Sequence, residues 1–230
     1  DMLSHDFEKL IVFRFWDRMN AAERAILAKR FAGKLLVIDY RNEADLQRHG
    51  VSFLAADFGK AWGELFTHLV ASGYRRLAVL TYVVPSDIPG ADVFVSPQEQ
   101  RLKGLTRAFG AAIFDHRKDV FRVDVTSPRA VYEATRLILE KGYDCVKIHN
   151  DQIAPMVYKA VSDAGKNIPR DVGIAGFDDI YFAEYLTPPL TTIHNDFDAY
   201  AREIFAWLKD PQRDVVIPHA VIERESTKRR

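Results

Sequence analysis

Residues 172–197 read VGIAGFDDIYFAEYLTPPLTTIHNDF, and this stretch decides the predicted fold. Residues 172–175 are apolar, which predicts a buried strand of a parallel sheet, and we expect Gly176 to let the backbone turn. Asp178 and Asp179 follow at the carboxyl end of the strand. Open parallel sheets bind their ligands at this edge, so the two carboxylates mark a candidate site.

The second half of the same stretch predicts a short helix and another strand. Residues 180–186 mix polar and apolar residues in a helical pattern. Pro188 and Pro189 exclude further helix, and residues 190–193 resume an extended apolar run. A strand, an acidic turn, a short helix, two prolines and a strand therefore follow one another.

Elsewhere in the chain, short apolar runs alternate with helical patterns. Residues 7–15 are predicted as a helix end that passes into a strand. The other predicted strands cover residues 34–39, 51–55, 76–81, 120–125, 143–149, 215–217 and 220–224. The predicted helices cover residues 21–32, 58–71, 98–109, 128–141, 152–164 and 197–209, with Asn20 and Ser127 as N-caps. Helices between short strands imply crossover connections, so the fold class is α/β with doubly wound parallel sheets.

The composition describes an ordinary globular protein. The chain has 230 residues, 48% of them hydrophobic and 28% charged, which excludes intrinsic disorder. Lys and Arg total 32, as do Asp and Glu, so the net charge of zero shows no nucleic-acid footprint. The one cysteine, Cys145, lies in a predicted strand, which indicates a buried thiol and a reducing cytoplasm.

The sequence shows no motif for secretion, membrane insertion or catalysis. No apolar run approaches the ~20 residues of a membrane span, and no signal-peptide pattern opens the chain. The sequence contains no nucleophile elbow, phosphate loop, dinucleotide fingerprint or zinc-protease motif, and its seven histidines are scattered. We therefore expect no enzyme activity, no cofactor and no metal.

Several blocks accompany residues 172–197 in a fixed order. They are residues 68–80 (HLVASGYRRLAVL), 101–108 (RLKGLTRA), 148–154 (IHNDQIA), 164–172 (AGKNIPRDV) and 221–227 (VIEREST). Together these blocks resemble the effector-binding domain of the LacI/GalR family of bacterial transcriptional regulators. The resemblance extends from about residue 55 to the end; before it, the match is only to a generic strand and helix.

The resemblance implies a periplasmic-binding-protein-like fold, in which two doubly wound subdomains are joined by three crossing strands. The first subdomain would comprise residues 1–73 plus 197–217, and the second residues 74–196 plus 218–230. Family members have a strand, a helix and a second strand before the element matched to residues 7–15. We therefore expect the first subdomain to be N-terminally truncated in this chain, which starts with Asp1, and its missing elements to lie in preceding sequence or to have been cleaved.

Three polar residues are the first candidates for effector binding. Asp178 can accept two hydroxyl hydrogen bonds, but either Asp178 or Asp179 could instead cap the helix that follows. Arg101 matches a family arginine that reaches the effector, although a surface ion pair is the alternative. Asn150 matches another effector contact, or it caps a helix; Pro155 indicates that this helix begins late, which weakens the match.

Aromatic residues and carboxylates supply the remaining candidates. Phe197 matches a family position that often stacks on the effector, although it could be a core residue. Trp16 with Asp17, and Asp57 with Phe58, each follow a predicted strand, and aromatic faces beside carboxylates suit sugar rings. These aromatic residues could also be exposed loop residues without a ligand.

The resemblance implies the ligand-sensing and dimerisation domain of a transcriptional regulator, binding a small-molecule effector such as a sugar between two subdomains. Its expected partners are the effector, a second copy in a homodimer, and operator DNA, the last through a helix-turn-helix headpiece absent from these residues. A transport-type sugar-binding protein of the same fold is the alternative, and an enzyme on this scaffold is a third.

Overall fold

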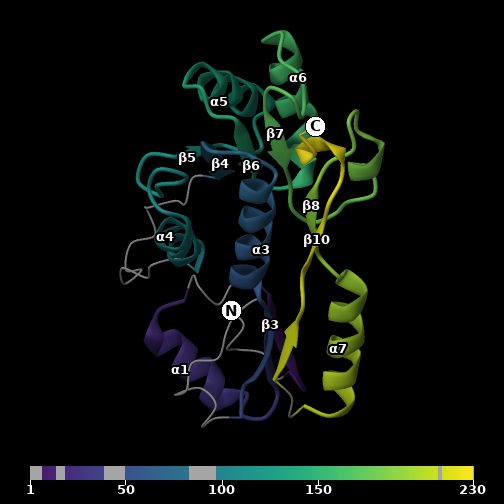
Figure 1. Cartoon of the computed structure of the whole chain (residues 1–230). Coiled ribbons are helices and arrows are strands. Elements are labelled where there is room, and N and C mark those ends of the chain that lie inside the picture. Colours follow the sequence, from purple (N-terminus) through teal and green to yellow (C-terminus); the bar gives the residue numbers. More distant parts are fainter. Residues whose placement is uncertain (1–6, 14–18, 39–49, 83–96, 212–213, 230) are drawn as a thin grey trace. The chain divides into compact units, whose positions relative to one another are not determined.

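The computed structural model describes residues 7–13, 19–38, 50–82, 97–211 and 214–229 (Figure 1). Its described residues form two compact units. The first takes its residues from Asp1–Asp57 and Asp196–Pro218, and the second from Phe58–Pro85, Pro97–Asn195 and His219–Arg230. No helix in the described part of the chain has the length and apolar character that crossing a membrane requires.

The first unit is built on a parallel sheet with strand order β1-β2-β3-β9. Its strands are β1 (Leu10–Phe13), β2 (Leu35–Ile38), β3 (Ser52–Ala56) and β9 (Val215–Ile217), with helices α1 (Ala21–Arg30) and α7 (Phe197–Lys209). Alternation along the strands sends Val37 and Phe53 into one core with Leu27 of α1. Helix α7 contacts β3 and β9.

The sequence prediction for α1 is confirmed at its start. The Asn20 side chain accepts a hydrogen bond from the backbone N–H of Glu23 at 3.0 Å, and the Glu23 carboxylate accepts one from the Asn20 backbone at 2.9 Å. This capping box satisfies two N–H groups that the first turn of a helix leaves without partners.

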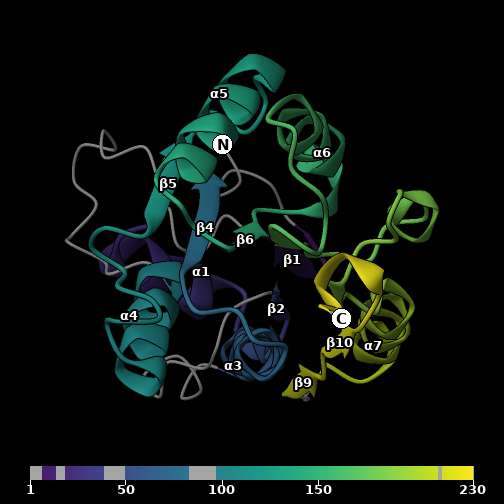
Figure 2. The same cartoon turned by 45° about the horizontal axis from the view of Figure 1, so that its top comes forward.

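The second unit holds a parallel sheet between two pairs of helices (Figure 2). Its strand order is β5-β4-β6-β7. The strands are β4 (Leu77–Tyr82), β5 (Val120–Val123), β6 (Cys145–Ile148) and β7 (Gly173–Ala175). Helices α3 (Phe58–Ala71) and α4 (Pro97–Phe109) cover one face, and α5 (Pro128–Glu140) and α6 (Ala154–Asp163) cover the other.

Side-chain alternation explains why both faces of this sheet are apolar. In β4, Leu77 and Val79 pack toward α3 and α4, whereas Ala78 and Leu80 pack toward α5 and α6. A parallel sheet covered by helices on both faces needs such uninterrupted apolar strands. An antiparallel pair, β8 (Thr192–His194) with β10 (Ala220–Ile222), completes the unit together with the short 3₁₀ helices η3 (Asp151–Ile153), η4 (Ala183–Tyr185) and η5 (Glu225–Thr227).

Two predictions differ from the structure. Residues 180–186 contain only the three-residue η4, because Leu190 N–H bonds back to Ala183 O and closes this segment as a turn. The predicted first subdomain extended to residue 73, whereas α3 lies in the second unit. Its apolar side chains, among them Leu65 and Leu69, share a core with Leu77 of β4.

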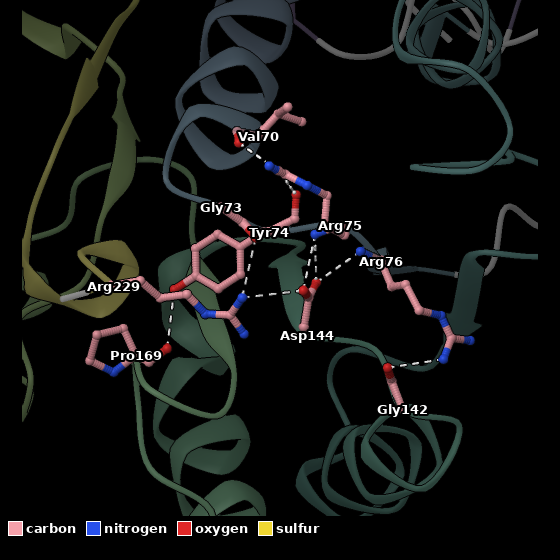
Figure 3. A network of polar contacts seen from close by, with 9 residues as sticks. All are labelled: Val70, Gly73, Tyr74, Arg75, Arg76, Gly142, Asp144, Pro169 and Arg229. Atoms are coloured by element: carbon pink, nitrogen blue, oxygen red, sulfur yellow. Dashed lines mark hydrogen bonds and ion pairs between the residues drawn. The ribbon is translucent and has the colours of Figure 1, made fainter.

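The half-buried carboxylate of Asp144 ties the end of the chain to this sheet (Figure 3). Asp144 accepts hydrogen bonds from the backbone N–H groups of Arg75 (3.0 Å) and Arg76 (2.9 Å). It also pairs with Arg229 at 3.3 Å, and the Arg229 guanidinium lies 4.3 Å from the ring centroid of Tyr74. The final residues are thus fixed beside the starts of β4 and β6.

Candidate functional site

Lys147 is a buried cation in the middle of an apolar sheet. It is the third residue of β6, and its side chain is only 2% exposed. Val146 and Ile148 pack toward α5 and α6, while Cys145 packs toward α3 and α4. Because strand residues alternate between faces, Lys147 projects to the same side as Cys145.

In the described part of the chain, aromatic rings contact the Lys147 ammonium and no carboxylate forms a salt bridge with it. Its Nζ lies 4.0 Å from the centroid of the Trp62 ring and 5.2 Å from that of Phe177. It donates one long hydrogen bond of 3.4 Å, to the backbone oxygen of His149. Burial, and to a lesser extent the nearby Arg101, together lower the pKa of Lys147 to about 7, against the opposing effect of Asp178 and Asp151.

Arg101 reaches the same group of aromatic residues from α4. Its guanidinium carbon lies 4.9 Å from the ring centroid of Phe58 and 5.9 Å from that of Trp62. The Phe58 ring in turn lies 5.6 Å from Phe177 and 4.8 Å from His219. We call Phe58, Trp62, Phe177 and His219 the aromatic cluster; it lies entirely in the second unit.

The two carboxylates after β7 lie in unusual backbone conformations. Asp178 has φ 101° and Asp179 has φ 55°, a region that residues with a side chain rarely adopt. The Asp178 carboxylate accepts a 3.5 Å hydrogen bond from Asn195, and its backbone N–H donates to Ile193. Asp179 pairs with Arg224 at 2.8 Å. Strained residues of this kind cluster at ligand sites.

The alternative that Asp178 or Asp179 caps a helix is wrong, because Phe182 occupies the N-cap position of η4. Asp179 is instead held structurally, by Arg224 and by His194 Nδ1 at 2.9 Å. The charge of Asp178, like that of Asp151, raises the pKa of Lys147.

Asp151 holds the turn that carries these residues. Its fully buried carboxylate accepts hydrogen bonds from the backbone N–H groups of Phe177 (2.7 Å) and Ile180 (3.1 Å) and from the hydroxyl of Thr192 (2.8 Å). Burial raises the pKa of Asp151 to about 6, although all three hydrogen bonds favour the charged form. The turn after β7 is therefore attached to both η3 and β8.

Gly176 is needed for close approach and not, as predicted, for a backbone turn. Its φ does not lie in the left-handed region. A Cβ at this position would lie 1.9 Å from Oδ1 of Asp151 and 2.9 Å from Cδ2 of Leu190. The absence of a side chain is what lets Asp151 reach the turn.

Asn150 does not cap the following helix. It precedes η3 but makes no capping hydrogen bond through its side chain, and its Oδ1 is buried without a partner within the described residues. The late start that Pro155 predicted for the helix is confirmed, since η3 comes first and the proline falls in the first turn of α6.

Only some of the predicted site residues lie near Lys147 and the aromatic cluster. Of the eight, Arg101 and Phe58 join the aromatic cluster, with Asp178 close enough to affect Lys147. Phe197 opens α7 in the first unit and is 58% exposed, so the core alternative is wrong. Asp57 is the last residue before the second unit, while Trp16 and Asp17 lie outside the described residues.

The sequence did not single out Lys147, the buried lysine that the aromatic cluster contacts. Lys147, Trp62, Phe177, His219 and Asp151 were not predicted as site residues. One signal was present, because a lysine in the strand sequence Cys-Val-Lys-Ile is unusual where the neighbouring residues are apolar. In the described part of the chain, no group of three His, Cys, Asp or Glu residues is arranged to hold a metal.

Replacing Gly176 tests the attachment of the turn. We expect Gly176→Ala to lower the free energy of unfolding by about 2–4 kcal/mol, because its methyl group displaces the Asp151 carboxylate from buried donors. Urea denaturation measures this change. Gly104→Ala is the control: Gly104 is an exposed residue of α4 with open space around it, and its replacement should stabilise by up to about 1 kcal/mol. Similar changes in the free energy of unfolding for the two substitutions would contradict the role assigned to Gly176.

Burial of Lys147 predicts a pH-dependent cost. Its folded pKa of about 7 lies below the ordinary 10.5, so between these values the unfolded chain binds more protons and stability rises with pH. We expect Lys147→Met to be more stable than the wild type by about 1–4 kcal/mol below pH 7, with the difference shrinking above it. Urea denaturation near pH 6 and near pH 9 measures the stability difference between Lys147→Met and the wild type. A difference that is the same at both pH values would contradict the assigned cost of burying the Lys147 charge. The control is Lys103→Met, at an exposed position of α4.

Comparisons with known proteins agree with the predicted resemblance. A family model for the periplasmic binding protein-like domain matches residues 66–227. The ribose operon repressor of Escherichia coli (strain K12) is 27% identical over 201 residues, covering 79% of this chain and 58% of the repressor. The transcriptional repressor PurR of Vibrio cholerae is 28% identical over 139 residues, covering 56% of this chain and 41% of PurR. The chain thus spans little more than half of the repressor's length.

Solved structures show the same fold. The Escherichia coli repressor ascG matches with a TM-score of 0.75 at 19% identity, covering 98% of this chain and 80% of that one. A sugar-binding LacI-family regulator from Escherichia coli, complexed with phosphate, matches with a TM-score of 0.74 at 19% identity, covering 98% and 78%. The predicted fold class is confirmed. The chain belongs to the periplasmic binding protein-like domain family, in the form found in LacI/GalR regulators.

Proposed function

We propose that this chain is the ligand-sensing and dimerisation domain of a LacI-type transcriptional regulator. Its effector is a small molecule, most simply a sugar or a sugar derivative. Relatives named as the ribose operon repressor and the transcriptional repressor PurR support the regulatory role, and LacI-family regulators of similar fold have been solved with bound ribose, glucose and lactose. Operator DNA would be bound through a headpiece outside these residues.

The observation that carries this proposal is the contact of Arg101 with the aromatic cluster beside Lys147, a lysine whose pKa the charge of Asp178 affects. Arg101 offers a planar set of donors, and Asp178 offers charged acceptors. Aromatic rings supply the apolar surface on which a sugar ring packs. This combination of flat faces and oriented polar groups is typical of small-molecule sites.

The proposed mechanism is a shift between two conformations. An effector that binds more tightly to one arrangement of the two subdomains favours that arrangement by the difference in binding free energy. In a dimer, the change would reposition the attached headpieces. Binding at Asp178 suits such a role, because the turn that bears it is connected to β8, and the chain continues from β8 into the first unit.

Effector binding can be tested by calorimetry with neutral and charged sugars and nucleobases. We expect one of them to bind with a Kd of at most about 1 mM, and Arg101→Ala to weaken it about 10- to 100-fold by removing charge-assisted hydrogen bonds. Arg107→Ala, an exposed arginine of the same helix, should leave binding unchanged. Retained affinity in Arg101→Ala would contradict the assigned role of Arg101.

The oligomeric state of this chain distinguishes the proposed regulator from the transport-type sugar-binding protein. Sedimentation of the 230-residue chain should give a dimer, because regulators of this type bring two headpieces to one operator. A protein that remains a monomer at high concentration but binds a sugar would favour the transport-type alternative.

A further inference from the structure

The Lys147 ammonium has few of the contacts that a buried charge requires. An ammonium has three N–H donors, whereas Nζ donates one 3.4 Å hydrogen bond to the backbone of His149. Within the described residues it forms no salt bridge, although its side chain is only 2% exposed. A buried charge is normally paired, because loss of hydration costs several kcal/mol.

A second cation shares the same aromatic ring. Arg101 lies 5.9 Å from the Trp62 centroid, whose face also contacts Lys147 at 4.0 Å. The two positive charges repel each other, which is why Arg101 lowers the pKa of Lys147. A negative group placed near both would relieve this repulsion.

The carboxylates of the site do not supply that negative charge fully. The Asp151 carboxylate is already bonded to Phe177, Ile180 and Thr192. Asp178 and Asp151 raise the pKa of Lys147, yet burial and Arg101 outweigh them and the value falls to about 7. The negative charge that the described residues place near the ammonium therefore does not offset its burial and the charge of Arg101.

Two further polar atoms are buried without partners. Nε1 of Trp62, a residue 5% exposed, has no hydrogen-bond acceptor in the described part of the chain, and Oδ1 of Asn150 has no donor. The indole N–H can only donate, so its missing partner is an acceptor such as an anionic oxygen. The amide oxygen can only accept, as from a hydroxyl.

We propose that the effector carries an anionic group, a carboxylate or a phosphate, which binds Lys147 and Arg101 while its hydroxyl groups donate to Asp178. This inference rests on the proposed function and specifies its ligand class as acidic or phosphorylated sugars. Asp178 would repel the anionic group, so the ligand is oriented with its charge toward the two cations. The aromatic cluster contacts its ring.

A purely structural role for Lys147 is a poor explanation of these contacts. An uncharged side chain of similar length, such as methionine, would fill the space beside Trp62 without losing ammonium hydration. Proteins keep such destabilising groups where ligands need them. The buried cation is therefore better explained by what it binds than by what it packs against.

Matched pairs of ligands test this proposal. Calorimetry at pH 7 and constant ionic strength would compare glucose with glucuronate and glucose 6-phosphate, and ribose with ribose 5-phosphate. We expect at least one charged probe to bind about tenfold or more tightly than its neutral counterpart, and Lys147→Met to reduce that ratio to about one. Competition by inorganic phosphate, but not by acetate, would assign the anion as phosphate, and the reverse as carboxylate.

Lys103→Met is the control and should retain the preference for the charged probe. Circular dichroism and urea denaturation of Lys147→Met would show that the variant is folded. Binding of neutral sugars alone, or an unchanged charge preference in Lys147→Met, would overturn this inference and leave the proposed function intact. Binding of no probe, neutral or charged, would overturn both.

Discussion

The Asp151 carboxylate holds together the part of the molecule on which the site depends. It is buried, it receives three hydrogen bonds, and its donors come from the turn after β7 and from β8. A buried acceptor satisfied in this way fixes its donors strongly, because releasing them would leave several polar groups without partners. Gly176 is the residue that permits this approach, since any side chain there would meet the carboxylate.

The positions of Phe177 and Asp178 follow from this attachment. Because the backbone N–H of Phe177 is bound to Asp151, its ring is held 5.2 Å from the Lys147 ammonium and 5.6 Å from Phe58. Asp178 is held with a positive φ of 101° by hydrogen bonds to β8. The strained backbone and the buried lysine both cost stability, and both occur at one place in the second unit. Such a concentration of unfavourable features is typical of a binding site.

Much of the fold could be predicted from the sequence because its signals are local. The cap at Asn20, the apolar pattern of α7 and the late helix start at Pro155 each depend on residues close together in the chain. The length of the helix expected after Asp179 was wrong for the opposite reason. The backbone N–H of Ile180 donates to Asp151, and that of Leu190 donates to the backbone oxygen of Ala183. A local helical pattern does not reveal these competing hydrogen bonds.

By itself, the sequence determined the class of fold, the order of its elements and the resemblance to LacI/GalR regulators, and it offered Arg101, Asp178 and Phe58 as candidate site residues. These features depend on hydrophobic periodicity, on turn residues and on the sequence blocks that carry the family resemblance. Only the tertiary structure decided that Lys147, Trp62 and Phe177 meet. They come from a strand, a helix and a turn far apart in the chain, and their contacts arise from sheet register and helix packing. The positive charge of Lys147 follows from the sequence, but which of the described side chains surround it follows only from the fold.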